Sequence, residues 1–553
     1  MKAERGINMD AESVFRTMTL REKIGHTVAV RHNSLIALPD LEKHLKENPY
    51  GAVWAMGNSK LIETGNEDIL DTGVSKSERY KRWFKKANSY LKTPLLVGID
   101  AGRGAQYKIS DLSETSNATG IGATGRPELA KEHGVCVASE IRCAGANWWW
   151  SPVIDLASRF LAVNIGRAFS DDRQLLAEMA CSQIEGIQSQ GVAAAAKHFP
   201  GPGTREYRDS HIAYSVNKTR YEEWEKTQGV IYEKVINTGV YSIMVGHMAF
   251  PAVDDTKVGG NYIPATLSYK IITGLLKNKM KFNGVVITDA IGMAGLSTLF
   301  EPGRLYVELL KAGNDVVLGP TSLDYIDVVE KAVLEGELPE ERVNDACMRV
   351  LALKEKLGLL SENYQDSTII NEEILGKTRA MNRRVAENAV TLVCDKNGKL
   401  PISAGSVGKV AIICSAHTKD IVDRVNTMKV EFEKRGAVVN VRRRLGSDEE
   451  SRKIAEENDL IIYAAFIGVH APLGGAGFFG EEAHTFLYAF RYGKEKSIGV
   501  SIGSPFVYYD YFPNADIFIN AYWHNDEMQE AVVKAIYGEI PFKGKSPFRL
   551  EPD

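Results

Sequence analysis

The feature that most constrains the fold of this chain is a repeated alternation of short apolar runs with segments of helical length. About seven such runs precede residue 320, and each ends in polar or glycine residues: 51–55, 94–100, 147–155, 192–196, 241–247, 284–289 and 314–319. Alternating strands and helices predict parallel βα units. So many units in one stretch favour a closed (β/α)8 barrel of the TIM type, with a doubly wound open sheet as the alternative.

A second alternation of strands and helices begins after residue 378. Its predicted strands lie at 390–393, 409–414, 437–441, 459–465, 497–502 and 517–520. They predict a separate three-layer α/β sandwich domain, which suits a chain of 553 residues. The polar stretch between the two patterns predicts a linker. We therefore expect a catalytic barrel over residues 1–360, a linker over 361–380 and a C-terminal α/β sandwich domain over 381–553.

Composition excludes several classes of function. The formal net charge of −4 carries no basic excess, so neither a nucleic-acid partner nor an anionic membrane partner is expected. Six scattered cysteines predict free thiols in a reducing compartment. The charged residues 1–10 show no secretory signal, and no apolar run approaches the length of about 20 residues that spans a bilayer. We expect a cytoplasmic protein, and the sequence carries no signal for its oligomeric state.

The segment 193–211 concentrates titratable side chains in a turn-rich stretch after an apolar run. Lys197-His198-Phe199-Pro200-Gly201 is followed by Pro202-Gly203 and then by Asp209-Ser210-His211. Proline and glycine end a buried strand and bring polar groups to its carboxyl end, which is where barrel enzymes carry their chemistry. This segment is the first candidate for an active-site loop.

Asp289 is the second candidate, because it closes the apolar run 284–288. A carboxylate at the exit of a buried strand can attack an electrophilic carbon and form a covalent intermediate. An aspartate at the same place can instead cap the following helix by accepting backbone N–H bonds. The spacing alone favours neither interpretation.

Asp209 and His211 form a third pattern. In an extended loop their side chains point the same way, so the carboxylate can orient one imidazole nitrogen while the other transfers a proton. A lone Asp-x-His is more often a surface loop without a role. Lys197 and His198 suit the binding of substrate hydroxyls, or they only lie at the end of a strand.

Other motifs carry weaker signals. Asp209, His211, Asp289 and His247 include ligand types for zinc or iron, but their spacing does not support a site, and we expect no metal or cofactor. The glycine-rich stretches 102–104 and 474–477 lack the spacing of nucleotide loops and predict turns. The run Trp148-Trp149-Trp150 predicts core packing more than stacking on a sugar.

Together these motifs resemble glycoside hydrolase family 3, and within it the NagZ-like β-N-acetylglucosaminidases in a two-domain form. The loop 197–203 followed by Asp209-Ser210-His211 resembles the hallmark loop of that subgroup, and 284–289 resembles the nucleophile strand of the family. Further likenesses lie at 18–25, 166–169, 246–248, 264–268, 312–318, 386–392 and 538–544. The resemblance covers nearly the whole chain.

The resemblance implies a retaining mechanism with a covalent glycosyl-enzyme. Asp289 would be the nucleophile, and His211, oriented by Asp209, would protonate the leaving oxygen and later activate water. Most retaining glycosidases use a carboxylic acid for that proton, whereas imidazole titrates near neutral pH and, when neutral, does not repel an anion such as phosphate. By the same resemblance, the sugar hydroxyls would be held by Asp100, Arg167, Lys197 and His198.

Four departures from the family pattern bear on specificity. Pro202 stands where the subgroup usually has histidine, and the segment from Gly203 to Asp209 is one residue longer. The stretch 101–105 replaces the usual Gln-Glu-Gly-Gly-Arg, and Ala290 replaces a common second aspartate. Sugar and aglycone preference are therefore the properties most open to change.

The leading hypothesis is an exo-acting β-N-acetylglucosaminidase on chitin-derived or cell-wall glycans, as in peptidoglycan recycling. One alternative keeps the site and transfers the sugar to phosphate, and another is a family 3 β-glycosidase with a different sugar preference. From other classes we consider a non-catalytic sugar-binding protein and a metal hydrolase. The glycine- and aromatic-rich stretch 468–482 is hypothesised to reach the active site from the second domain.

Overall fold

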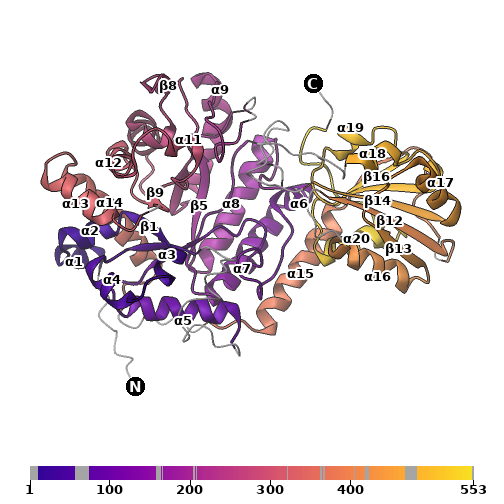
Figure 1. Cartoon of the computed structure of the whole chain (residues 1–553), viewed down its shortest axis with the longest axis horizontal. Helices are drawn as coiled ribbons and strands as arrows, with labels where there is room; N and C mark the ends of the chain where they lie inside the picture. Colours follow the sequence, from indigo (N-terminus) through magenta and orange to yellow (C-terminus); the bar gives the residue numbers. More distant parts are fainter. Residues whose placement is uncertain are drawn as a thin grey trace. The chain divides into compact units, whose positions relative to one another are not determined.

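The computed structural model describes most of the chain and divides it into two compact units (Figure 1). The described residues are 10–55, 74–156, 164, 166–203, 206, 208–320, 322–361, 364, 368–403, 405–416, 422–467 and 483–550. Unit 1 comprises Met1–Ser113, Lys131–Leu156 and Ala180–Gly376. Unit 2 comprises Glu114–Ala130, Ala157–Met179 and Lys377–Asp553, so it is assembled from three separate stretches of chain.

Unit 1 contains an eight-stranded parallel sheet that closes on itself. Its strands follow one another around the sheet in chain order: β1 (Val28–Arg31), β2 (Ala52–Trp54), β3 (Leu96–Ile99), β4 (Trp148–Trp149), β5 (Ala193–Phe199), β6 (Ser242–Val245), β9 (Val285–Thr288) and β10 (Val317–Leu318). β10 pairs with β1, and a bridge between Ile287 and Val316 joins β9 to β10. The predicted (β/α)8 barrel is therefore confirmed, and the doubly wound alternative is wrong for this part of the chain.

Alternation along the strands places one set of side chains inside the barrel. Apolar side chains from all eight strands meet there in a single buried cluster that includes Ala29, Ala52, Leu96, Trp148, Ala193, Ala195, Met244, Val285, Ile287, Val316 and Leu318. Side chains two residues apart on a strand share a face. The next members of this inward series therefore stand at the carboxyl ends of the strands: Arg31, Trp54, Asp100, Lys197 and Asp289.

Helices connect the barrel strands, as Figure 1 shows. Those before β5 are α1 (Ala11–Arg16), α2 (Leu20–Gly25), α3 (His32–Ile36), α4 (Leu41–Glu47), α5 (Lys76–Asn88), α6 (Ala118–Ala123), α7 (Pro127–Cys143) and α8 (Arg173–Ser189). Those after β5 are α9 (Tyr221–Trp224), η4 (Glu225–Gly229), α10 (Val230–Asn237), η5 (Ala265–Leu267), η6 (Lys270–Lys279), α11 (Ala294–Ser297), α12 (Pro302–Ala312), α13 (Tyr325–Leu334) and α14 (Glu340–Lys356). A short hairpin, β7 (Lys257–Val258) with β8 (Asn261–Tyr262), precedes η5.

Local sequence explains where several of these helices begin. Thr19 and Glu22 form a capping box: the Thr19 hydroxyl accepts the N–H of Glu22, whose carboxylate accepts the N–H of Thr19. Asp10 accepts from the N–H of Ser13 and starts α1 in the same way. The run Trp148-Trp149-Trp150 is buried, as the prediction of core packing requires.

Unit 2 is built on a six-stranded mixed sheet. Its strands are β11 (Thr391–Asp395), β12 (Lys409–Ala416), β13 (Val438–Arg442), β14 (Leu460–Phe466), β15 (Ser497–Ser501) and β16 (Ile517–Asn520), in the order β11-β16-β15-β14-β12-β13. Only β11 among them pairs antiparallel, with β16. The predicted α/β sandwich is confirmed.

Helices of unit 2 lie on both faces of this sheet (Figure 1). Unit 2 includes α6, named above, and the helices that follow the barrel are α15 (Glu372–Ala389), η7 (Val422–Val425), α16 (Asn426–Lys434), α17 (Asp448–Glu457), α18 (His484–Tyr488), η10 (Lys494–Lys496), α19 (Val507–Tyr511) and α20 (Asp526–Ile536). α15 begins at Glu372, inside the polar stretch for which a linker is predicted, and three acceptor-rich residues, Asn371, Glu372 and Glu373, stand at its start.

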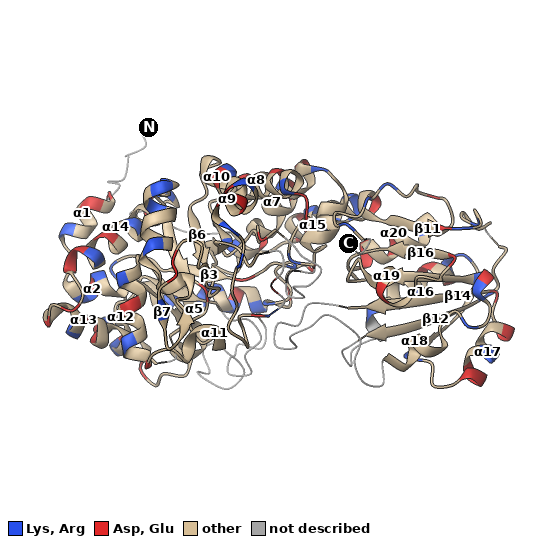
Figure 2. Ribbon diagram, turned by 90° about the horizontal axis from the view of Figure 1, so that it is seen from above, with Lys and Arg blue, Asp and Glu red and all other residues tan. Residues whose placement is uncertain are grey.

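Charge on both units is mixed. Acidic and basic side chains are interspersed along the outer helices (Figure 2), in keeping with the small net charge of −4. Within the described part of the chain, no helix combines the length and the apolar character that a membrane crossing requires.

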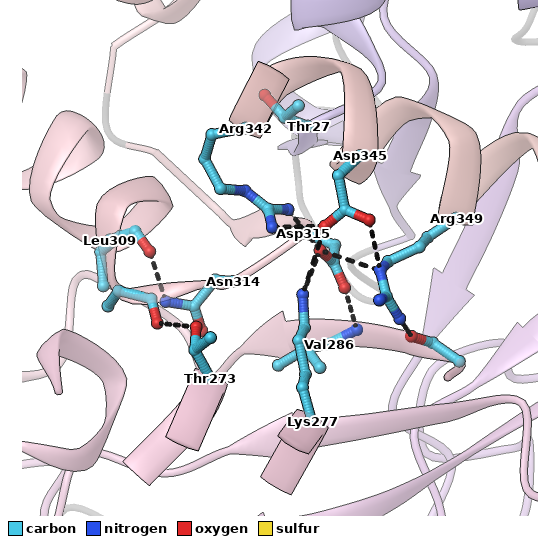
Figure 3. A network of polar contacts seen from close by, with 12 residues as sticks. Thr27, Thr273, Lys277, Val286, Leu309, Asn314, Asp315, Arg342, Asp345 and Arg349 are labelled. Carbon is cyan, nitrogen blue, oxygen red and sulfur yellow. Dashed lines mark hydrogen bonds and ion pairs between the residues drawn. The ribbon is translucent and has the colours of Figure 1, made fainter. Parts of the chain in front are cut away.

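A buried network of charges lies at the amino ends of β9 and β10 (Figure 3). Asp315, which is fully buried, accepts the backbone N–H of Val286 at 2.8 Å and the Lys277 ammonium at 2.7 Å. Arg342 donates to Asp315 and, at 2.6 Å, to Asp345. Burial lowers the pKa of Lys277, and the Asp315 charge partly offsets that effect. The network ties η6 and α14 to the strands at the end of the barrel opposite the candidate site.

Candidate active site

Three strands of unit 1 bring the predicted side chains of the barrel to one edge. Asp100 directly follows β3, Lys197 and His198 lie near the end of β5, and Asp289 directly follows β9. Because the carboxyl ends of parallel strands meet at the same edge, these residues converge although up to 189 positions separate them in the chain.

Asp289 is the centre of the cluster. Its backbone N–H donates to the Val245 carbonyl at 2.8 Å, and one carboxylate oxygen accepts the N–H of Ala290 at 2.7 Å. α11 begins only at Ala294, with Met293 at its N-cap, so Asp289 is not the cap of that helix. The capping alternative is therefore wrong for this residue, and its second carboxylate oxygen is available to chemistry.

Asp289 is held in its ionised form. Burial by itself raises the pKa of this carboxyl, but electrostatic interactions with neighbouring side chains outweigh burial, and the pKa lies below its ordinary value of 3.8. The groups responsible are, in order, His198, His247, His211 and Lys197. A carboxylate that is ionised at neutral pH has the protonation state that a nucleophile needs.

His198 is oriented by a carboxylate that comes from a neighbouring strand connection. Asp155 accepts the backbone N–H of His198 at 2.9 Å and its Nδ1–H at 2.8 Å. The other ring nitrogen, Nε2, then lies 3.8 Å from a carboxylate oxygen of Asp289. Asp155 therefore fixes the imidazole, and the imidazole places Nε2 beside the Asp289 carboxylate.

Lys197 and Asp100 form the next pair along the edge. The Lys197 ammonium lies 3.3 Å from a carboxylate oxygen of Asp100, with 3% of the lysine side chain exposed and 40% of the aspartate. The buried cation and the more open carboxylate give one donor and one acceptor site side by side. That combination suits hydrogen bonds to adjacent hydroxyl groups.

His247 lies beneath the turn that follows Asp289. Its Nε2–H donates to the Ala290 carbonyl at 3.0 Å, and Nδ1, which must then be unprotonated, accepts from the Thr266 hydroxyl at 3.0 Å. Burial lowers its pKa. Both ring nitrogens are occupied in this neutral state, so His247 supports the turn and does not present a ligand.

The predicted contact between Asp209 and His211 is present. Asp209 Oδ1 accepts Nδ1–H of the His211 ring at 2.6 Å and the backbone N–H of His211 at 2.9 Å. The aspartate side chain is 6% exposed and the histidine 35%. The outer nitrogen of an exposed, oriented imidazole can take up and return a proton.

Two anchors hold this loop in place. The carbonyls of Ser210 and His211 accept the N–H groups of Gly295 and Ala294, at the start of α11. A Cβ at Gly295 would lie 3.0 Å from the carbonyls of Ser210 and Ala213, so a larger residue would displace these carbonyls by a few tenths of an ångström. The His211 loop is thus attached to the element that follows Asp289.

Glu206 is the second anchor, from inside the loop. It is 6% exposed, accepts the N–H of Val216 at 2.7 Å and forms a two-pronged pair with Arg208 at 2.9 and 2.7 Å. Burial raises the pKa of Glu206, but these hydrogen bonds outweigh it and the pKa is lowered. The hydrogen bond from Val216 to Glu206 joins residues on the two sides of Asp209 and so closes the loop.

Asp155, Glu206 and Gln228 belong to the cluster but are missing from the sequence-based prediction. Asp155 closes the apolar run 147–155, and the same strand-end signal that indicates Asp289 could have found it. Gln228 donates to the Ile154 carbonyl and accepts the N–H of Leu156, both at 2.8 Å, from the π-helical turn η4. Neither Gln228 nor Glu206 has a sequence signal, because their partners are backbone groups far along the chain or in the same loop.

Six of the seven predicted residues lie in unit 1 and take part in the contacts above: Asp100, Lys197, His198, Asp209, His211 and Asp289. Arg167 belongs to unit 2 and is partly buried. Gly203, beside the unusual Pro202, has φ +80°, and a Cβ there would lie 2.6 Å from Asn217 Oδ1. The stretches 468–482 and 474–477 lie outside the described residues.

No group of three or more histidine, cysteine, aspartate or glutamate side chains is arranged to hold a metal ion in the described ranges. Asp209, His211, Asp289 and His247, which have the right ligand types, are committed to the separate contacts given above. The arrangement provides an ionised carboxylate, an oriented imidazole and a set of hydroxyl-binding groups. Those parts suit covalent catalysis with proton transfer at an acetal carbon.

Comparison with known proteins agrees with this chemistry. Residues 19–353, more than half of the chain, match the model described as the glycosyl hydrolase family 3 N terminal domain. The chain is 27% identical over 491 residues to a "Beta-N-acetylglucosaminidase/beta-glucosidase" from Cellulomonas fimi, covering 83% of this chain and 84% of that protein.

Two solved structures share the fold over nearly the whole length. One is "Beta-glucoside phosphorylase BglX", with a TM-score of 0.82, 23% identity and coverage of 98% of this chain and 95% of that one. The other is a family 3 β-N-acetylglucosaminidase from Paenibacillus sp. str. FPU-7, with a TM-score of 0.80, 23% identity and coverage of 97% and 99%. With its barrel, its strand-end residues and the match over 19–353, the chain belongs to glycoside hydrolase family 3.

Proposed function

We propose that this protein is a retaining exo-β-N-acetylglucosaminidase that hydrolyses terminal β-linked N-acetylhexosamine through a covalent glycosyl-enzyme. The observation that carries the proposal is the ionised Asp289 carboxylate at the end of β9, beside the oriented imidazole of His198. The sugar is proposed from the names of similar proteins, among them the enzyme of Cellulomonas fimi and several β-hexosaminidases at 29 to 32% identity. Chitin-derived or cell-wall glycans are the proposed source.

In the first step Asp289 attacks the anomeric carbon. The bond to the leaving oxygen breaks, and a proton from His211 reaches that oxygen, so that the aglycone departs as an alcohol. Asp209 accepts the Nδ1–H of His211 at 2.6 Å and thereby leaves Nε2 as the nitrogen that carries the transferred proton. The sugar remains attached to Asp289 as an ester.

In the second step neutral His211 takes a proton from water. The resulting oxygen nucleophile attacks the anomeric carbon, the ester bond to Asp289 breaks, and the sugar leaves with its original configuration. Lys197, Asp100 and His198 bind the sugar hydroxyls during both steps, and Arg167 is proposed as a fourth binding residue. Their charged hydrogen bonds orient the anomeric carbon toward Asp289.

The test compares an aryl β-N-acetylglucosaminide with the matching β-glucoside. Wild type should hydrolyse the acetamido sugar, and Asp289→Gly should lose at least about 10³-fold in kcat because the covalent step is gone. Azide should restore turnover of Asp289→Gly and yield a glycosyl azide of inverted configuration, since azide attacks from the side that the carboxylate occupied. The exposed Asp255→Asn change is the matched control.

Three results would contradict the proposal. Preference for the glucoside would mean that N-acetylhexosamine is not the preferred sugar. Loss of activity on chelation would point to a metal hydrolase. Sugar binding without turnover would point to a binding protein. Full activity of Asp289→Gly would remove the nucleophile assignment.

A second candidate, a phosphorylase, keeps the site and changes the acceptor. It is favoured by one observation, the imidazole of His211 in place of a carboxylic acid, because a neutral base does not repel phosphate. Release of sugar 1-phosphate at millimolar phosphate would establish it, and free sugar as the only product would exclude it.

A further inference from the structure

Arg31 brings a cation to the mouth of the barrel that the site described above does not use. It ends β1, two residues after Ala29 of the inner cluster, so its side chain belongs to the inward series of that strand. Its register partner on β2 is Trp54, and the guanidinium carbon lies 5.7 Å from the centre of the Trp54 ring. A stacked guanidinium keeps its edges free for hydrogen bonds.

Two glycines border this guanidinium and the ring behind it. A Cβ at Gly292 would lie 3.1 Å from Nη2 of Arg31, and a Cβ at Gly319 would lie 3.0 Å from the Trp54 ring. Gly292 stands three positions after Asp289, in the turn whose Ala294 N–H binds the His211 carbonyl. Arg31 therefore borders the same turn that carries the proposed nucleophile and holds the proposed acid.

The donors around Arg31 have no acceptor. Nε of Arg31 and the indole nitrogens of Trp54 and Trp150 are buried, and none of them makes a hydrogen bond within the described ranges. Trp54 and Trp150 touch, with ring centres 5.8 Å apart. All three side chains can only donate, and a buried donor without a partner costs about 1–3 kcal/mol.

The carboxylates of the site are committed elsewhere. Asp100 lies beside Lys197, Asp155 accepts from His198, and Asp209 accepts from His211. No ion pair joins any of them to Arg31 in the part of the chain that the structure describes. The mouth of the barrel thus contains a positively charged group of hydrogen-bond donors that lacks an anionic acceptor.

We propose that Arg31, backed by Trp54, forms a subsite for an oxyanion, either a carboxylate or a phosphate. The planar guanidinium presents paired N–H groups that match the two oxygens of such a group. The inference rests on the proposed function, because it adds an anionic group to the reaction at Asp289. That group is either carried by the aglycone of the substrate or is inorganic phosphate, the acceptor of the glycosyl group.

The phosphate case balances without another reactant. An oxygen of hydrogen phosphate forms the bond to the anomeric carbon while the ester bond to Asp289 breaks, and the phosphate proton passes to Nε2 of His211. The products are the Asp289 carboxylate, a sugar 1-phosphate and a His211 that is protonated for the next turnover. In the carboxylate case the anion stays on the aglycone and leaves with it.

A pair of matched substrates tests the carboxylate source. They are the β-N-acetylglucosaminides of 4-hydroxybenzoate and of its methyl ester, which differ in one negative charge. Arg31→Met should lower kcat/KM for the acid about tenfold more than for the ester, the loss expected for one charged hydrogen-bonding group. Arg31→Lys, which keeps the charge but not the fork, should fall between, and Lys257→Met on the exposed hairpin is the charge-matched control.

A phosphate series tests the other source. Wild type should turn over faster as phosphate is added at constant ionic strength and release sugar 1-phosphate, and Arg31→Met should lose that acceleration. An unchanged acid-to-ester ratio together with an unchanged phosphate response would overturn the proposal.

A binding measurement separates this inference from the proposed function. The melting temperature of wild type should rise with sodium phosphate or with sodium benzoate relative to sodium chloride, and the rise should be absent in Arg31→Met. If neither glycoside is turned over, the proposed function fails while this measurement still decides the subsite. An equal response of wild type, Arg31→Met and Lys257→Met to both anions would refute it.

Discussion

Asp155 orients the His198 imidazole from the side opposite to Asp289. It accepts two hydrogen bonds from His198, one from the backbone and one from the ring, and is itself 2% exposed. The ring nitrogen that faces Asp289 is therefore determined from the opposite side of the imidazole. Asp155 is a positioning residue for His198.

Asp155→Asn should lower kcat/KM about 10- to 100-fold, because an amide cannot accept the ring N–H and the backbone N–H with the same oxygens and charge. A merely structural role would lower the melting temperature without altering the kinetics of the remaining folded enzyme. We expect KM to rise as well, and Asp255→Asn should change neither constant. Unaltered kinetics in Asp155→Asn would contradict the positioning role.

Lys354 is a buried lysine on α14 whose titration couples stability to pH. Its ammonium lies 2.9 Å from the Thr93 hydroxyl and 3.1 Å from Nε2 of His26. Burial lowers the pKa of Lys354 from its ordinary value of 10.5 to about 7. Between these two values the unfolded chain binds the proton that the folded protein has released, so stability rises with pH there.

Lys354→Met should remove this contribution. The free energy of unfolding of wild type should gain up to about 1.4 kcal/mol per pH unit above pH 7 relative to the variant, and the variant should be the more stable of the two at pH 7. Urea unfolding of both proteins at pH 7, 8 and 9 measures the difference. Two parallel pH profiles would show that Lys354 stays protonated when buried.

At the scale of elements, the His211 loop depends on Glu206 more than on its own sequence motif. Glu206 closes the loop from within, through Val216 and Arg208, and the carbonyls of Ser210 and His211 attach it to α11. The depressed pKa of Glu206 means that this stabilisation is present above its ordinary value of 4.5 and is lost as the pH falls through the folded value.

Glu206→Gln should loosen the loop and lower kcat about tenfold, since an amide cannot form the two-pronged ion pair with Arg208. The change in kcat should be larger than the change in KM, because the sugar-binding residues come from other strands. Glu222→Gln, an exposed carboxylate on α9, is the control. A change in melting temperature alone, with kcat preserved, would mean that Glu206 only stabilises the fold.

The strand-end rule explains which parts of the site could be predicted. Asp100, Lys197 and Asp289 each follow an apolar run that ends in a polar residue, so the sequence indicates them and the barrel brings them together. β1 escapes prediction because α3 begins directly after Arg31, so no turn marks the end of the strand. The proposed oxyanion subsite therefore lies on the one barrel strand that the sequence pattern does not indicate.

Helix boundaries are less predictable than helix positions. α15 starts at Glu372, although the stretch before residue 378 has little hydrophobic periodicity, because Met381, Val385 and Ala389 later in the same helix supply its buried face. η4 and η6 are π-helical within segments whose apolar spacing predicts ordinary helices. In both cases packing decides what the local pattern leaves open.

At the scale of the whole molecule, unit 1 separates a reactive end from a structural end. The network around Asp315 lies at the amino ends of β9 and β10 (Figure 3), whereas Asp289 directly follows the carboxyl end of β9. Barrels commonly divide stability and chemistry in this way. Changes at the two ends should therefore have separable effects.

Asp315→Asn should destabilise unit 1 by about 3–5 kcal/mol, because Lys277 and Arg342 lose the buried carboxylate that compensates their charge. Activity per folded molecule should stay within about twofold at a temperature well below the melting point. Calorimetry and active-site titration of the same sample check both statements. A large loss of activity in fully folded Asp315→Asn would show that the two ends are coupled.

Because unit 2 is assembled from three separate stretches of chain, it cannot be removed by a simple truncation. Glu114–Ala130 and Ala157–Met179 belong to unit 2 although they are encoded among the barrel segments. Within unit 2, Lys545 donates to the Ala123 carbonyl, Asn117 donates to the Tyr522 carbonyl at 2.9 Å, and Ser170 donates to Pro547 at 2.6 Å. A stop codon placed before α15 would leave Asn117, Ala123 and Ser170 without these partners, so a shortened transcript encodes an unfinished polypeptide that proteases and chaperones should recognise.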